Sequence, residues 1–243
     1  MVQKALMTIS HQRDVRLLMW TVYVHSNTCS CMIENEAKPL RMLLVGAGGI
    51  GSQVLELLSA GLRRVGLSGS ITVMDGDVVE ASNLGHQRYT KADIGQPKVA
   101  CLAERLDDEN GPLRIVADNQ NLRQPEQLEG YDLVMVCVDR PEPRRLVHAL
   151  KVPWLDVRCS GDGWVVLPST ASASLVARMT PDHEPKSCQV DGALEAGNLE
   201  FGFAVAAAYG AQWALQSWRG APPPGQTMGS LTYGALRFPE VLA

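Results

Sequence analysis

The sequence predicts an α/β fold in which a mostly parallel β-sheet carries helices on both faces. Three observations lead to this prediction: short continuous apolar runs typical of buried parallel strands, apolar residues at helical spacing between those runs, and a glycine-rich turn after the first run. Strands that alternate with helices can all run in the same direction, because each helix returns the chain to the same end of the sheet.

The first part of the predicted domain alternates strand and helix without interruption. Its apolar runs end at glycine or aspartate, and a proline occupies the favoured first position of one helix. In order, the predicted elements are a strand at Arg41–Gly46, a helix at Gly49–Arg64, a strand at Ser70–Asp75, a helix at Pro97–Asp107, strands at Leu113–Asp118 and Tyr131–Asp139 with a short helix near Pro125–Glu129 between them, a helix at Arg144–Leu150 and a strand at Val152–Val157.

The alternation changes in the last third of the chain. Gly163–Ser169 and Ala173–Met179 are predicted as two strands joined by a tight turn, which would give the sheet an antiparallel extension. Met179–Cys188 is polar and contains proline, so it is predicted to be a loop. Leu199–Trp218 is predicted as a long apolar helix, and Gln226–Leu242 has room for one or two edge strands.

Composition and charge exclude several classes of protein. The 46% hydrophobic and 20% charged residues are ordinary for a globular protein, and a net charge of −4 spread along the chain disfavours a nucleic-acid binder. Leu17–Val24 lacks a following cleavage site, and Phe201–Leu215 is too short to span a membrane. We therefore expect a cytoplasmic protein that binds neither nucleic acid nor membrane, with residues 1–38 as an N-terminal arm and residues 39–243 as a single domain.

A glycine-rich turn lies between the first predicted strand and the first predicted helix. Gly46-Ala-Gly48-Gly49-Ile-Gly51 matches G-x-G-x-x-G, a pattern that lets the backbone approach a phosphate at a helix N-terminus. Asp75 ends the second strand, where it can accept hydrogen bonds from ribose hydroxyls. The pattern predicts a nucleotide-binding, Rossmann-like fold. A tight turn without a ligand is the alternative, and the pattern alone does not separate ATP from NAD.

Two charged residues point to a polyphosphate ligand. Lys98 lies in the first turn of a predicted helix, where the helix dipole disfavours a cation unless it reaches an anion such as a phosphate. Asp139 ends a buried strand at the carboxyl edge of the sheet, where a carboxylate can hold Mg²⁺. The alternatives are a solvated surface lysine and a carboxylate that caps the following helix.

Three motifs in order resemble the ThiF/MoeB/HesA family, the superfamily of the ubiquitin-activating enzymes. The stretch DGDVVEASNLGHQ at residues 75–87 is followed by GQPK at 95–98 and CVD at 137–139. The family pattern is D-x-D-x-V-x-x-S-N-L-x-R-Q, then G-x-x-K, then C-x-D. With the glycine turn, the resemblance covers about residues 41–169.

The resemblance implies an ATP-dependent adenylyltransferase. Such an enzyme uses ATP and Mg²⁺ to activate the C-terminal carboxylate of a small ubiquitin-like or sulfur-carrier protein that ends in Gly-Gly, and members generally form homodimers. The residues expected to bind ATP are Gly46, Gly48, Gly49, Gly51, Asp75, Asp77, Asn83, Gln87 and Arg88, those expected to be catalytic are Lys98, Asp139, His86 and Cys188, and Asp139 is the expected Mg²⁺ ligand. For Asn83 and Gln87 a loop-stabilising role remains an equal alternative.

The sequence departs from the family pattern in three places. His86 stands where the family has arginine; a protonated imidazole can replace the charge but not the bidentate fork, and Arg88 is the nearest substitute. The N-terminal R-x-x-R-Q element, which lends an arginine to the neighbouring subunit, is not found. The zinc-binding CxxC pairs are missing as well.

Cys188 is the candidate for a covalent step. It lies in the segment at about 179–190 that corresponds to the family's crossover loop, where members with a thioester step keep a cysteine. Lys186 and His183 are near it in sequence and would favour a thiolate. An ordinary cysteine is the alternative, and Cys159 is a weaker rival.

Two other functions are kept beside adenylation. A catalytically weak or silent family member that binds a partner as a subunit would explain His86 and the absent second arginine. An NAD-dependent oxidoreductase would explain the glycine turn, but neither Lys98 nor the Ser82-Asn83-Leu84 stretch.

Overall fold

The computed structural model describes residues 39–182, 184, 188–190, 192–193 and 196–239. The chain divides into two compact units, residues 1–38 and residues 39–243, and all of the described residues belong to the second. The expected N-terminal arm lies outside the described residues, as do His183 and Lys186.

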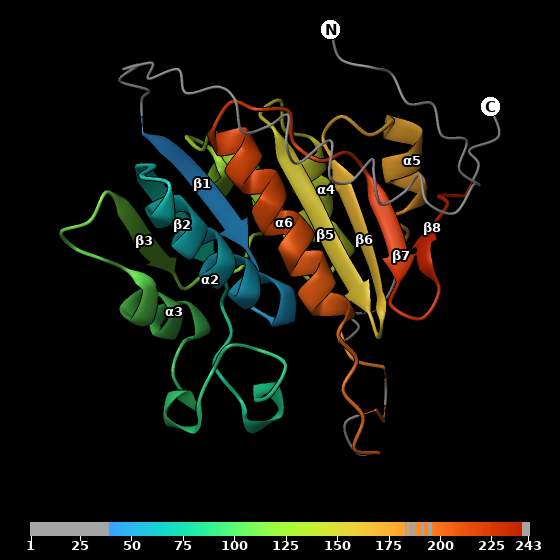
Figure 1. The fold of residues 1–243 in the computed structure, drawn as a ribbon, viewed down its shortest axis with the longest axis horizontal. Coiled ribbons are helices and arrows are strands. Elements are labelled where there is room, and N and C mark those ends of the chain that lie inside the picture. The colour runs from blue at the N-terminus through green and yellow to red at the C-terminus, as the bar shows by residue number, and fades with distance from the viewer. Residues whose placement is uncertain (1–38, 183, 185–187, 191, 194–195, 240–243) are drawn as a thin grey trace, which may run out of the picture. The chain divides into compact units, whose positions relative to one another are not determined.

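Within these residues, eight strands form one sheet in the order β3-β2-β1-β4-β5-β6-β7-β8 (Figure 1). Strands β3 to β5 pair in parallel, whereas β5 to β8 pair antiparallel. This confirms the predicted mostly parallel sheet with an antiparallel extension. The strands are β1 Leu40–Val45, β2 Gly69–Met74, β3 Leu113–Asp118, β4 Leu133–Val136, β5 Trp154–Ser160, β6 Gly163–Pro168, β7 Thr227–Ser230 and β8 Gly234–Leu236.

Helices cover both faces of the parallel part of the sheet. Met42 and Leu44 of β1 belong to the hydrophobic cluster that includes α2, α3 and α6, whereas Leu43 and Val45 belong to the cluster that includes α4. All four side chains are buried, as expected for a parallel strand with helices on both sides. The helices are α2 Gly49–Arg64, α3 Lys98–Leu106, α4 Pro141–His148, α5 Ala173–Arg178 and α6 Gly202–Trp218, with 3₁₀ turns η1 Ala81–Asn83, η2 Lys91–Asp93 and η3 Pro125–Leu128.

One predicted strand is wrong. Ala173–Met179, predicted as a strand after a tight turn, contains helix α5 instead. Ser172 explains the difference, because its hydroxyl accepts a hydrogen bond from the Leu175 backbone N–H at 3.3 Å and so caps the helix N-terminus. The antiparallel extension is formed by β6 with β7 and β8, and these last two strands confirm the prediction of edge strands within Gln226–Leu242.

The long apolar helix predicted at Leu199–Trp218 is present as α6, which begins at Gly202. It packs beside α2 on one face of the sheet (Figure 1). In the part of the chain that the structure describes, no helix combines the length and the apolar character needed to cross a membrane.

The glycine turn brings the N-terminus of α2 against the end of β1. Gly46 has φ +98°, a conformation that favours glycine. At Gly51, an added Cβ would lie 1.8 Å from the carbonyl oxygen of Gly46. Glycine at position 51 is therefore what allows the helix to start so close to the strand.

Replacing Gly51 by alanine should destabilise the fold. The new methyl group must displace the Gly46 carbonyl, so we expect the free energy of unfolding to fall by about 2 kcal/mol or more. Gly61→Ala in the same helix is the matched control, because its Cβ would meet no atom within 4 Å. That change should raise stability by about 0.5–1 kcal/mol. Urea unfolding of both variants tests this, and equal stability of the two would contradict it.

Candidate active site

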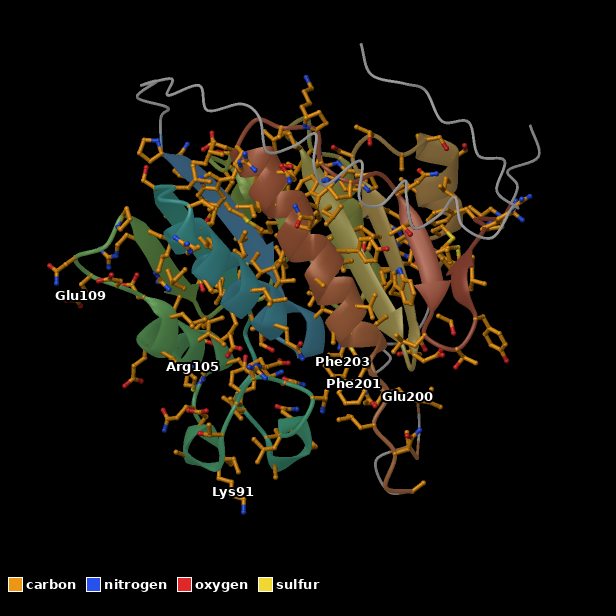
Figure 2. The ribbon with its side chains drawn as sticks, viewed as in Figure 1. Lys91, Arg105, Glu109, Glu200, Phe201 and Phe203 are labelled. Carbon is orange, nitrogen blue, oxygen red and sulfur yellow. The ribbon has the colours of Figure 1, made fainter. Side chains whose placement is uncertain are left out.

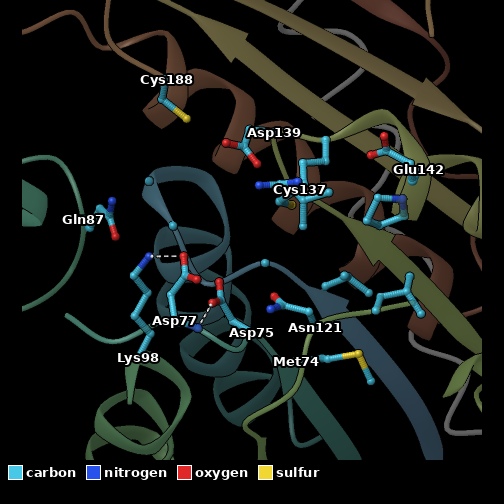
Figure 3. A pocket seen from close by; sticks show the side chains of 18 of the residues that line it. Met74, Asp75, Asp77, Gln87, Lys98, Asn121, Cys137, Asp139, Glu142 and Cys188 are labelled. Carbon is cyan, nitrogen blue, oxygen red and sulfur yellow. Dashed lines mark hydrogen bonds and ion pairs between the residues drawn. The ribbon is translucent and has the colours of Figure 1, made fainter. Parts of the chain in front are cut away.

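A cavity of about 720 Å³ opens at the carboxyl edge of the parallel strands (Figure 3). Its walls come from the glycine turn, the end of β2, the loop after β3 and the loop between β4 and α4. Of the residues expected in the site, it brings together Gly46, Gly48, Gly49, Asp75, Asp77, His86, Gln87, Lys98, Asp139 and Cys188. Gly51, Asn83 and Arg88 are not among the described residues that line it.

Lys98 places a buried ammonium group at this cavity. The residue is 7% exposed, and its Nζ lies 3.1 Å from Asp77 Oδ2 (Figure 3). The Lys98 backbone N–H also donates to the Asp77 carbonyl at 3.0 Å, so the first turn of α3 is tied to the segment after β2. Because the Asp77 side chain is 65% exposed, the ion pair sits at the boundary between the cavity wall and solvent.

Asp75 holds the glycine turn in place. Its Oδ2 accepts the Ala47 N–H at 2.7 Å, and its Oδ1 accepts the Asp77 N–H at 2.9 Å. The carbonyl of Ala47 in turn accepts the hydroxyl of Tyr89 at 2.6 Å. Burial raises the pKa of Asp75, against the effect of the two N–H donors. Each carboxylate oxygen keeps a lone pair that can accept a further hydrogen bond from a ligand hydroxyl.

The N-terminus of α2 faces the cavity. Its N-cap is Gly48, which has no side chain that could cap the helix, and the first turn contains no acidic residue. A Cβ added at Gly48 would meet nothing within 4 Å, which shows open space in front of the turn. The N–H groups at the start of the helix, together with the helix dipole, favour an anion at this position.

His86 is buried and uncharged near neutral pH. It is 6% exposed, and burial lowers its pKa, with a further contribution from the charge of Lys98. The ring therefore does not supply the positive charge that the family arginine would supply. Within the described residues, His86 Nδ1 and the side-chain oxygen of Gln87 are buried without a hydrogen-bond partner. Two unpaired polar atoms at a cavity wall fit a site that accepts a polar ligand.

Arg88 and Asn83 point to other partners. The Nε of Arg88 lies 2.5 Å from Glu56 on α2, so its guanidinium is directed away from the cavity and does not replace the family arginine. The side-chain oxygen of Asn83 accepts the Glu80 N–H at 2.9 Å and caps η1. Asn83 therefore makes a contact of the loop-stabilising kind that the sequence analysis kept as an alternative to ATP binding.

Sequence reasoning missed the wall formed by the loop after β3. Asn121 and Arg123 line the cavity, and the Asn121 side-chain oxygen accepts the Gly76 N–H at 3.4 Å. Arg140 and Glu142, at the start of α4, line it as well. The position of this loop could have identified it, because it follows the third predicted strand. Ligands of open α/β sheets bind beyond the carboxyl ends of the strands.

A buried ion network lies behind the Asp139 loop. Arg144 of α4 donates to the Asp156 carboxylate and to the Val138 carbonyl, and Arg158 donates to the same carboxylate. Asp156 is fully buried. Burial lowers the pKa of Arg144 to about 9, and the charge of Arg158 adds to this. Arg144 thus ties the loop that carries Asp139 to β5.

Most of this chain matches one known protein family. The ThiF family matches residues 33–239, which is most of the sequence. The chain belongs to the ThiF family. This confirms the resemblance drawn from the motifs at residues 75–87, 95–98 and 137–139.

Curated relatives of this ThiF-family chain carry adenylyltransferase names. It is 38% identical over 120 residues to the sulfur carrier protein adenylyltransferase of Thermus thermophilus, a match that covers 47% of this chain and 42% of that protein. It is 37% identical over 112 residues to the adenylyltransferase and sulfurtransferase uba4 of Aspergillus niger, covering 44% of this chain and 22% of that protein. The chain thus spans less than half the length of these two relatives.

A solved structure shares the fold. Escherichia coli MccB, crystallised with AMPCPP and MccA, superposes with a TM-score of 0.62 over 82% of this ThiF-family chain and 64% of the MccB chain. The two sequences are 16% identical, so the likeness shows the Rossmann-like α/β fold alone.

Removing the carboxylate from the ion network should be costly. Asp156→Ala leaves Arg144 and Arg158 buried without their counter-charge, so we expect the free energy of unfolding to fall by about 3–5 kcal/mol. Asp182→Ala, which breaks the exposed pair between Asp182 and Arg145, should cost less than about 1 kcal/mol. Urea unfolding compares the two, and similar losses would show that the buried pair is not structural.

His148 should make stability depend on pH. Its Nε2 lies 2.9 Å from Asp156 Oδ2, and burial, with the nearby arginines, lowers its pKa to about 4 from 6.5. The native state then binds fewer protons than the unfolded state, so stability falls as the pH drops from about 6.5 toward 4. His148→Gln keeps a donor but does not titrate. As the pH falls over that interval, the stability of the variant relative to the wild type should rise. Parallel profiles of unfolding free energy against pH, measured with urea, would contradict this.

Proposed function

We propose that this protein is an ATP-dependent adenylyltransferase that activates the C-terminal carboxylate of a small ubiquitin-like or sulfur-carrier protein. The observation that carries the proposal is that Lys98 and Asp139, from distant parts of the chain, line one cavity with the glycine turn. The names of the relatives support the same reaction. The proposal includes residues 39–243 as the adenylation domain, a carrier that ends in Gly-Gly, a homodimer and a cytoplasmic location.

The chemistry proposed is in-line attack by a carrier carboxylate oxygen on the α-phosphorus of ATP. A bond from that oxygen to phosphorus forms, the bond from phosphorus to the bridging oxygen breaks, and pyrophosphate leaves. Both reactants are anions, so catalysis consists mainly of positioning and charge neutralisation. The carboxylate is already ionised, and no strong base is required.

The residues on the cavity wall suit these tasks. The N-terminus of α2 and the Lys98 ammonium face the position proposed for the phosphates, and Asp75, on the same wall, would accept hydrogen bonds from the ribose hydroxyls. Asp139 would hold Mg²⁺, because this ion is usually bound by one or two carboxylates together with substrate phosphates. When bound, Mg²⁺ supplies further neutralisation of phosphate charge.

The positive charge missing at His86 has two nearby sources. Arg123 and Arg140 line the cavity from the loop after β3 and from the N-cap of α4. We propose that these two guanidinium groups, rather than His86 or Arg88, assist Lys98 in holding the phosphates. Guanidinium groups suit phosphate because their N–H groups match its oxygens in pairs.

Cys188 is proposed to take the activated carboxyl group in a second step. It lines the same cavity, and its pKa is lowered by its interaction with the Cys159 thiol and by the charge of Arg144. Its thiolate would attack the carbonyl carbon of the acyl adenylate, with AMP as the leaving group, to give a thioester.

Pyrophosphate exchange tests the proposal. With ATP, Mg²⁺ and a Gly-Gly-ended carrier, the wild type should exchange labelled pyrophosphate into ATP, and Lys98→Ala should lower the rate by about 10²–10³-fold. Lys91→Ala is the control, because Lys91 lies on η2 with an exposed side chain that points away from the sheet (Figure 2). A wild-type rate in Lys98→Ala would refute the role given to the ammonium group.

A silent, partner-binding subunit is the second candidate. The specific observation in its favour is that His86 is neutral while Arg88 is paired with Glu56, so neither replaces the family arginine. Binding of ATP together with background exchange for every carrier would favour this function.

A further inference from the structure

Two cysteine thiols lie between two cavities. Cys188 lines the cavity described above, whereas Cys159, on β5, lines a second cavity of about 390 Å³. Asp139 lines both cavities, so they share a wall at this point. The Cys188 carbonyl accepts the N–H of Gly161, two residues after Cys159, and the two thiols lie close enough to shift each other's pKa.

Backbone contacts hold the two cysteines in this arrangement. The Gly161 N–H donates to the Cys188 carbonyl at 2.9 Å, which links the residue directly to the turn after β5. The Gln189 side chain then bonds both the carbonyl and the N–H of Glu200, at 2.8 and 2.9 Å. The position of Cys188 relative to Cys159 is therefore fixed by the sheet and by the segment that leads into α6.

The two thiols differ chemically. The pKa of the Cys188 thiol is lowered by its interaction with the Cys159 thiol, by the charge of Arg144 and by the Ile50 N–H at the start of α2, against the opposing effects of burial and of the Asp139 charge. The lowered pKa favours a thiolate on Cys188 and leaves the proton on Cys159, whose pKa is raised by the same interaction between the thiols and by burial. A thiolate beside a neutral thiol is the arrangement of a reactive and a resolving cysteine.

We propose that Cys159 and Cys188 form an oxidation site at which a hydroperoxide produces an intramolecular disulfide. The Cys188 thiolate attacks the peroxide oxygen, the O–O bond breaks, and Cys188 becomes a sulfenic acid. The Cys159 sulfur then attacks the Cys188 sulfur, the S–O bond breaks, and water leaves as the Cys159 proton is released. In sum, two thiols lose two electrons and two protons, and the peroxide is reduced to water or to water and an alcohol.

The disulfide would withdraw Cys188 from covalent chemistry with a carrier. This consequence rests on the proposed thioester step, but the disulfide itself does not, because it forms without ATP or a carrier. Cys137 also lines the first cavity, yet burial raises the pKa of its thiol to about 12, so it should remain a thiol. Cys101, on α3, is buried elsewhere in the core.

Peptide mapping of the full chain tests the proposal. The reduced protein is treated with hydrogen peroxide, alkylated and digested with trypsin, which separates Cys159 in residues 159–178 from Cys188 in residues 187–219. We expect these two peptides to be joined and to be two hydrogen atoms lighter than their sum, and we expect dithiothreitol to separate them. The peptide with Cys137 should be alkylated as in the untreated protein.

Variants distinguish a specific pair from general oxidation. Cys188→Ser should abolish the linkage, and Cys159→Ser should abolish it while leaving a sulfenic acid on Cys188 that dimedone labels. Cys101→Ser is the control and should link as the wild type does. Linkage of Cys188 to another cysteine, or oxidation of Cys188 to sulfinic acid with Cys159 still a free thiol in the wild type, would overturn the proposal. If pyrophosphate exchange fails while the linkage forms, only the proposed function is refuted.

Discussion

The site depends on one close approach, the packing of the α2 N-terminus against the end of β1. Only glycine at position 51 leaves room for the Gly46 carbonyl, and the turn so formed is held by Asp75 at the Ala47 N–H and by Tyr89 at the Ala47 carbonyl. A helix dipole aimed at an open cavity is the result. In the proposed function, the charged residues on the wall act together with this helix end, whose N–H groups and dipole favour an anion.

A second constraint acts from the other side of the cavity. The Asp139 loop is joined to β5 through Arg144 and Asp156, at the strand where the sheet changes from parallel to antiparallel. The same strand carries Cys159, and Arg144 also lies close to the Cys188 thiol. The buried guanidinium of Arg144 therefore influences both the position of the Asp139 loop and the pKa of the Cys188 thiol. Asp139 and Cys188 belong to different proposed steps.

The sequence predicted the parallel sheet and the residues at its carboxyl edge, because strand periodicity and the glycine turn are local signals. It also placed Lys98 correctly in a first helical turn. It did not predict that Arg88 would pair with Glu56, since that contact depends on how η1 and its neighbouring loop fold back onto α2. Ala173–Met179 was misassigned because one capping hydroxyl, on Ser172, outweighed the appearance of a β run. Asn121 and Arg123 were missed because their loop has no motif of its own.

The central claim is that a nucleoside triphosphate, and not a dinucleotide, occupies this cavity. Thermal unfolding with ATP and Mg²⁺, compared with NAD, tests it most directly, because a ligand that binds only the native state stabilises it by about 2.7 kcal/mol at one hundred times its Kd. We predict a rise in Tm with ATP and Mg²⁺ that is reduced in Lys98→Ala, and no rise with NAD. An equal or larger rise with NAD, or an ATP effect unchanged by Lys98→Ala, would contradict the account.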